Sequence, residues 1–151
     1  MKKNFSDVPK NYSKDTDELF TELLQEKCVE NFLSRNQDEL ILPLTEYLEK
    51  ILTEKSLSKA DVIKLSGLNR EYAYHIFSGK KNPSRQKILA LALAMNLNLD
   101  ETQRLLRHAQ LNLLYPRKEW DAIIISAIEQ NLSVMETNEL LHRLGETIFL
   151  E

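Results

Sequence analysis

Apolar residues recur at helical spacing along most of the chain from residue 16 onward. The first such stretch has Thr16 as a plausible N-cap, and its apolar stripe comprises Leu19, Phe20, Leu23, Leu24, Val29, Phe32 and Leu33. This spacing predicts one helix, or two short ones, ending near Asn36. The stripe is broad, so its apolar side chains are expected to pack against another surface. Either it folds back on the rest of the chain, or it pairs with the same helix of a second copy.

Two further stretches predict the helices of a core. The first has Pro43 in its first turn and an apolar face made by Leu44, Tyr47, Leu48, Ile51 and Leu52. The second is capped by Ser84 and begins at Arg85. Its residues 88–95 are apolar on every side, which predicts a helix at the centre of a core.

The second half of the chain contains an internal repeat. Residues 88–106 recur 35 positions later as residues 123–141, with eight identities in 19 aligned positions. Each copy carries the residues of a capping box, and a fainter version lies upstream; the three pairs are Ser58/Asp61, Asn98/Glu101 and Ser133/Glu136. We interpret the repeat as shared packing of three helical hairpins. The last hairpin is expected to begin at Pro116 and to end with a helix from Val134 to Leu144.

Residues 57–83 are punctuated as two short helices joined by a tight turn. Ser58 is expected to cap a helix that begins at Lys59, and Gly67 supplies the left-handed conformation that ends it. Asn69 then caps a second helix over residues 70–77, which Gly79 stops. Two helices so close in sequence must cross steeply.

This stretch resembles the XRE family of lambda-repressor-like helix-turn-helix DNA-binding domains. The resemblance extends over about residues 44–109, and the matching residues are Leu57, Ser58, Gly67, Leu68, Asn69, Ile76, Gly79 and Pro83. It implies an all-α fold with a five-helix helix-turn-helix domain. We divide the chain into a flexible tail (1–15), an N-terminal helical extension (16–36), the helix-turn-helix domain (37–111) and a C-terminal helical hairpin (112–151).

The resemblance also implies where DNA would bind. In such a domain the helix over 70–77 lies in the major groove, with Ala73, Ile76 and Phe77 facing the core. Base contacts are then expected from Arg70, Glu71, Tyr74 and His75. Phosphate contacts are expected from Lys59, Lys64, Asn69, Lys80, Lys81, Asn82, Ser84 and Arg85.

The distribution of charge supports this location for a DNA-binding surface. The whole chain has a formal net charge of −3. Residues 56–87, however, carry seven Lys or Arg against two Asp or Glu, a net charge of +5, while the segments before and after each carry −4. An acidic body with one basic face would approach a phosphate backbone in one orientation.

These observations favour a sequence-specific regulator of bacterial or phage type that binds double-stranded DNA as a homodimer, since one motif reads few base pairs. The alternative is a protein-interaction module on the same scaffold, suggested by the acidic majority and by the aromatic residues Tyr72, Tyr74 and Phe77.

Other classes of function have no support in the sequence. The three histidines and Cys28 do not lie at metal-ligand spacings, and no nucleotide-binding or hydrolase motif occurs, so we expect no enzyme, metal or cofactor. No signal peptide or membrane span is expected, because the longest apolar run is eight residues. A single cysteine suits the cytoplasm, and we expect Cys28 to be buried as a small apolar residue.

Overall fold

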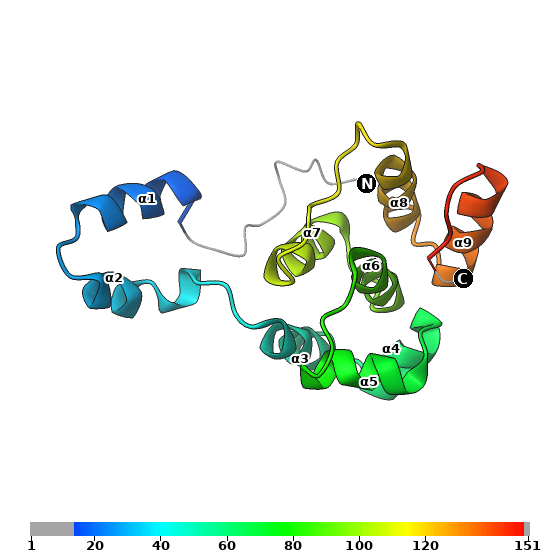
Figure 1. Cartoon of the computed structure of the whole chain (residues 1–151), viewed down its shortest axis with the longest axis horizontal. Coiled ribbons are helices and arrows are strands. Elements are labelled where there is room, and N and C mark those ends of the chain that lie inside the picture. Colours follow the sequence, from blue (N-terminus) through cyan, green and yellow to red (C-terminus); the bar gives the residue numbers. More distant parts are fainter. Residues whose placement is uncertain (1–13, 150–151) are drawn as a thin grey trace. The chain divides into compact units, whose positions relative to one another are not determined.

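The computed structural model describes residues 14–149, and every regular element within them is helical (Figure 1). The chain divides into two compact units, an N-terminal one that ends at Ile41 and a larger one over Leu42–Glu151. Within the described range no helix is long and apolar enough to cross a membrane. The all-α prediction is confirmed.

In its described residues, 14–41, the N-terminal unit contains α1 (Thr16–Gln25), α2 (Val29–Arg35) and the 3₁₀ turn η2 (Gln37–Glu39). Two short helices were one of the predicted alternatives. Asp15, not Thr16, is the N-cap of α1, because its carboxylate accepts the Glu18 N–H at 2.8 Å. Of the predicted tail, residues 1–13 lie outside the described range.

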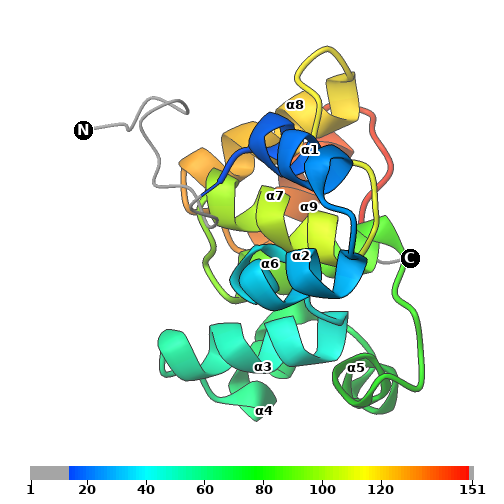
Figure 2. The same cartoon turned by 90° about the vertical axis from the view of Figure 1, so that its left-hand side faces the viewer.

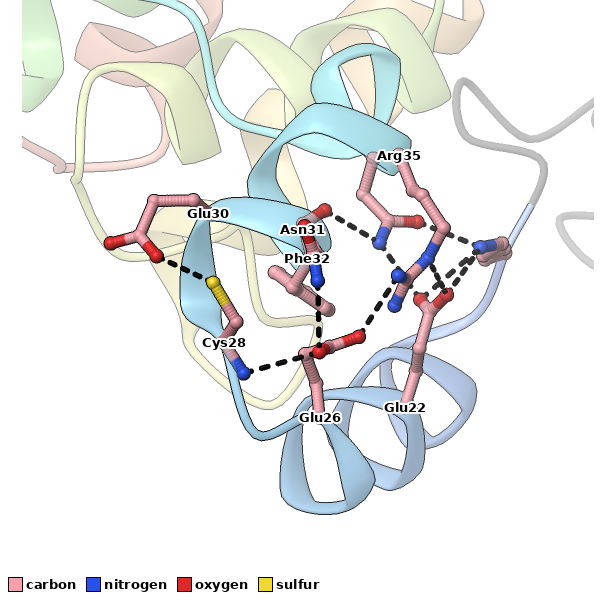
Figure 3. A network of polar contacts seen from close by, with 9 residues as sticks. Glu22, Glu26, Cys28, Glu30, Asn31, Phe32 and Arg35 are labelled. Carbon is pink, nitrogen blue, oxygen red and sulfur yellow. Dashed lines mark hydrogen bonds and ion pairs between the residues drawn. The ribbon is translucent and has the colours of Figure 1, made fainter.

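Polar contacts hold α1 and α2 together at one side of this unit (Figure 3). Glu22 accepts hydrogen bonds from Asn36, Lys14 and Arg35, and these bonds lower the pKa of its carboxyl. Glu26 accepts the Cys28 N–H at 3.1 Å and one Arg35 nitrogen at 2.9 Å, with the same effect on its pKa. The two helices are therefore joined by charge more than by a core.

The apolar stripe of this unit stays largely in water. Phe32 is buried, but Leu24 is 83% exposed, and Phe20, Leu23, Val29 and Leu33 are also exposed. Whether this stripe serves a second copy stays a prediction. The burial predicted for Cys28 is wrong: Cys28 is the exposed N-cap residue of α2, and its thiol donates to Glu30 at 2.7 Å. A unit with so small a core has no interior to receive it.

Over residues 42–149, the described part of the larger unit, seven helices pack together around one apolar core. They are α3 (Leu44–Glu54), α4 (Lys59–Ser66), α5 (Arg70–Ser78), α6 (Arg85–Ala94), α7 (Leu99–His108), α8 (Glu119–Glu129) and α9 (Val134–Arg143). Helix α6 is central, as predicted, and each residue from Ile88 to Leu93 is buried. Figure 2 shows α3, α4 and α5 together at one end of this unit.

Three helix pairs in this unit share one turn. Ser56, Asn96 and Asn131 adopt left-handed conformations with φ of 54°, 54° and 57°. In each case the following leucine donates its N–H to a carbonyl five residues earlier, which closes a Schellman motif. The next residue caps the second helix, and full capping boxes form at Asn98 and Ser133. The repeat is thus a repeated hairpin, and α8 begins at Glu119 instead of at Pro116.

Candidate nucleic-acid interface

A single serine fixes the turn between α4 and α5. Gly67 ends α4 with φ of 72°, and Leu68 next to it is buried in the core. The Ser66 hydroxyl, fully buried, donates to the Ile63 carbonyl at 2.6 Å and accepts the Leu68 N–H at 3.2 Å. Asn69 then caps α5 by accepting the Tyr72 N–H at 3.0 Å. The turn therefore satisfies its own backbone groups and sets the crossing of the two helices.

Helix α5 has one side in the core and one side in water. Ala73, Ile76 and Phe77 are buried, which confirms the side predicted to face inward. Arg70 and Glu71, at the N-terminal end of the helix, are exposed. Tyr74 and His75 are half-buried, and Tyr74 packs partly against the core. One side of α5 therefore faces solvent, and its most exposed part is the end predicted to meet the bases.

Arg70 and Tyr74 lie together beside a shallow hollow between α4 and α5. The Arg70 guanidinium carbon lies 5.8 Å from the centre of the Tyr74 ring, at the i, i+4 spacing that brings helical side chains together. The hollow is also lined by Lys64, Asp61 and Gly67. Two predicted base contacts and one predicted phosphate contact thus meet on one surface.

The loop after α5 presents a second set of polar residues. Gly79 has φ of 88°, and an added Cβ would come within 3.2 Å of the Thr45 methyl group, so a larger residue would be strained there. The Lys81 N–H donates to the His75 carbonyl at 3.2 Å, which fixes the path of the loop. Lys80, Lys81 and Asn82 are exposed, and among residues 14–149 the two lysines form no ion pair.

Some predicted phosphate contacts already have partners inside the protein. Lys59 pairs with Glu49 of α3 and lies 5.3 Å from the centre of the Phe77 ring. Ser84, the N-cap of α6, accepts the Lys87 N–H at 3.4 Å. Asn69 is likewise engaged as a cap. The Ser84 hydroxyl and the Lys59 ammonium can still contact a phosphate, but each already has a partner within the protein.

Arg85 is a correction to the predicted phosphate contacts. Its guanidinium donates to both carboxylate oxygens of Asp121, at 2.9 and 2.8 Å, and to the carbonyls of Asn112 and Leu113. Four of its five N–H groups are therefore used within the protein. Arg85 connects α6 to α8 and is removed from the predicted interface.

A comparison with protein families matches this part of the chain. The family HTH_3, described as helix-turn-helix, matches residues 48–101, which include α4, the turn and α5. Residues 48–101 form an XRE-type helix-turn-helix domain. No curated protein and no solved structure matches the chain in the corresponding searches.

Two features of the helix-turn-helix domain were missed by the sequence reading. Ser66 bridges the turn from inside, and only its place directly before Gly67 could have suggested this. Lys87 lies with its ammonium nitrogen 4.0 Å from the centre of the Tyr72 ring, which orders both side chains beside α5. The first feature rigidifies the motif, and the second places a cation against Tyr72 of α5.

Proposed function

We propose that this protein is a sequence-specific double-stranded DNA-binding transcriptional regulator that acts in the cytoplasm as a homodimer. Helix α5 enters the major groove, where Arg70 contacts bases, a guanine edge being the best match for its guanidinium. Glu71, Tyr74 and His75 contribute further base contacts. Lys64, Lys80, Lys81 and Asn82 contact phosphates on either side, with Lys59, Asn69 and Ser84 at helix starts as secondary contacts.

The observation that supports this most is the solvent-facing side of α5 within a matched helix-turn-helix domain. Its first turn carries exposed Arg70 and Glu71, and the exposed lysines of the following loop lie at its other end. The remainder of the chain is acidic, so the positive charge of Lys64, Lys80 and Lys81 would direct this face toward DNA.

The alternative of a protein-interaction module loses part of its support. Phe77, one of the aromatic residues behind it, is 4% exposed and belongs to the core. Tyr72 and Tyr74 are half-buried and also pack against that core. An apolar docking surface on α5 is therefore smaller than the sequence suggested.

Duplex binding measured against salt concentration tests the proposal. Lys80→Ala should weaken binding to all sequences alike and reduce the slope of log affinity against log salt by about one. Arg117→Ala, which removes an exposed cation outside this surface, is the matched control and should change neither quantity. An absence of duplex binding by the unaltered protein at low salt would contradict the proposal and favour the interaction module.

A further inference from the structure

The hairpin of α8 and α9 has an open groove on one side. Its floor is apolar, from Ile123, Leu132, Leu140 and Leu144, and Leu144 is 51% exposed. The opposite side of the same hairpin is closed, since Ile124 and Leu141 are fully buried toward the centre of the larger unit. One side of this hairpin is therefore packed against the rest of the larger unit, and the other side is open.

The 35-residue repeat identifies what this groove corresponds to elsewhere in the chain. The structural repeat extends beyond the helices, because Gln103 accepts the Leu114 N–H and its counterpart Asn138 accepts the Phe149 N–H, both at 2.8 Å. Positions on the closed face are buried in both copies. Positions on the groove face differ: Ile88 and Leu105 are fully buried, whereas their counterparts Ile123 and Leu140 are half-exposed.

In the first repeat, the hairpin of α6 and α7, this face is covered by another hairpin of the same chain. Helix α7 packs against α3, and α6 packs against α4 (Figure 1). The His108 ring stacks on Tyr47 with centroids 3.7 Å apart, and Glu101 pairs with Lys55 at 2.9 Å. His108 corresponds to Arg143 and Glu101 to Glu136, and both of these line the open groove. The open groove of the α8–α9 hairpin therefore corresponds to the face of the α6–α7 hairpin that the α3–α4 hairpin covers.

The pattern of helix contacts shows which hairpin would fit. Wherever two hairpins of this chain pack, the first helix of each lies against the second helix of the other: α3 with α7 and α4 with α6, then α6 with α9 and α7 with α8. This is the contact pattern of a local two-fold axis. A face that packs in this way is complementary to another copy of itself.

Charges on the groove are arranged for such pairing. In two-fold packing, α8 of a second copy takes the place of α3, so Gln130 stands where Lys55 stands and faces Glu136. One carboxylate oxygen of Glu136 caps α9, so the other is available to accept a hydrogen bond from Gln130. Glu101 divides its two oxygens in the same way, between the cap of α7 and Lys55. In the same register Arg143 of the second copy replaces His108 and Ala122 replaces Tyr47, so Glu119, one helical turn before Ala122 at the start of α8, lies within reach of that arginine.

We propose that the α8–α9 groove is the homodimer interface, closed by the same groove of a second copy in an antiparallel four-helix arrangement. This names the interface of the homodimer in the proposed function and rests on that function. It buries Ile123, Leu140 and Leu144 of both copies and places two Glu119–Arg143 pairs at the rim.

The full-length chain tests the interface by sedimentation equilibrium. Glu119→Arg and Arg143→Glu should each raise the dimer dissociation constant by about tenfold or more, since each juxtaposes like charges twice across the axis. The double variant E119R/R143E should recover most of the lost affinity. Both positions are exposed, so folding should be unaffected, which circular dichroism checks.

A second pair of variants tests the apolar floor. Leu144→Lys should weaken the dimer, whereas Met135→Lys, which alters an exposed apolar residue of α9 outside the groove, should not. A monomeric unaltered chain at high concentration, or a dimer indifferent to all groove variants, would overturn this interface. The second outcome would point to the N-terminal unit. Binding of R143E to a duplex with a single half-site measures DNA contact without dimerisation. A failure of the proposed interface can therefore be distinguished from a failure of DNA binding.

Discussion

His108 is a buried titratable side chain in the core of the larger unit. Its ring lies parallel to that of Tyr47 within 1°, and its Nδ1 faces the Arg104 carbonyl at 2.9 Å, so that nitrogen carries the proton. Burial lowers the pKa of His108 below its ordinary value of 6.5, with help from Arg107 and Lys50, although the bond to the Arg104 carbonyl opposes this. The neutral ring is therefore the form that the folded protein accommodates.

This depressed pKa predicts a dependence of stability on pH. Between the folded pKa and 6.5, the unfolded chain binds the His108 proton more tightly than the folded chain does, so the free energy of unfolding falls as pH decreases below 6.5. Urea unfolding at pH 7.5 and pH 5.5 measures the difference. His108→Gln should flatten the dependence, and His142→Gln, at an exposed position, should preserve it. An equal slope in both variants would contradict this role for His108.

At the scale of helices, the Arg85–Asp121 pair connects the helix-turn-helix domain to the C-terminal hairpin. Asp121 is 2% exposed, and it also accepts the Tyr115 N–H at 2.9 Å. Burial alone would raise the pKa of Asp121, but the hydrogen bonds from Arg85 and Tyr115 hold it below its ordinary value of 3.8. The hairpin that the sequence predicted after residue 111 therefore belongs to the same compact unit as the helix-turn-helix domain.

Removing this carboxylate should destabilise the larger unit. Asp121→Ala leaves the Arg85 guanidinium and the Tyr115 N–H without their acceptor, and we expect a loss of about 3 kcal/mol in the free energy of unfolding. Glu71→Ala removes an exposed carboxylate of the same unit and should cost far less. Denaturant unfolding of the two variants at neutral pH makes the comparison. Equal losses would mean that the pair does not stabilise the fold.

Local signals explain which elements could be predicted. Both ends of α4 and α5 and the start of α6 were found because a capping side chain or a glycine sits at each of these boundaries and acts within four residues. The Arg85–Asp121 pair joins residues 36 apart, and nothing in the spacing of either indicates the other. Cys28 was misplaced for a similar reason, since its burial depends on the size of the core around it and not on its neighbours in sequence. The role of Ser66 in the turn was missed because nothing in the sequence distinguishes a serine whose hydroxyl is buried from one that is exposed.

At the scale of the whole molecule, charge is divided between a basic helix-turn-helix segment and acidic flanks. Two of the seven cations of that segment, Lys59 and Arg85, are paired with carboxylates of the protein itself. The positive charge offered to DNA therefore comes mainly from Lys64, Arg70, Lys80, Lys81 and Lys87. We expect modest affinity for nonspecific DNA, with specificity supplied by base contacts from α5 in each half of a dimer.

Selection of binding sequences from random duplex DNA, carried out with the unaltered protein and with Arg70→Ala, tests the central claim most directly. The unaltered protein should enrich a two-fold symmetric sequence. Arg70→Ala should flatten the preference at one base pair in each half-site, corresponding to about 1–3 kcal/mol of lost discrimination, while other positions keep theirs. Enrichment of the same sequence with undiminished preference at every position, or no enrichment by either protein, would contradict the placement of α5 in the major groove.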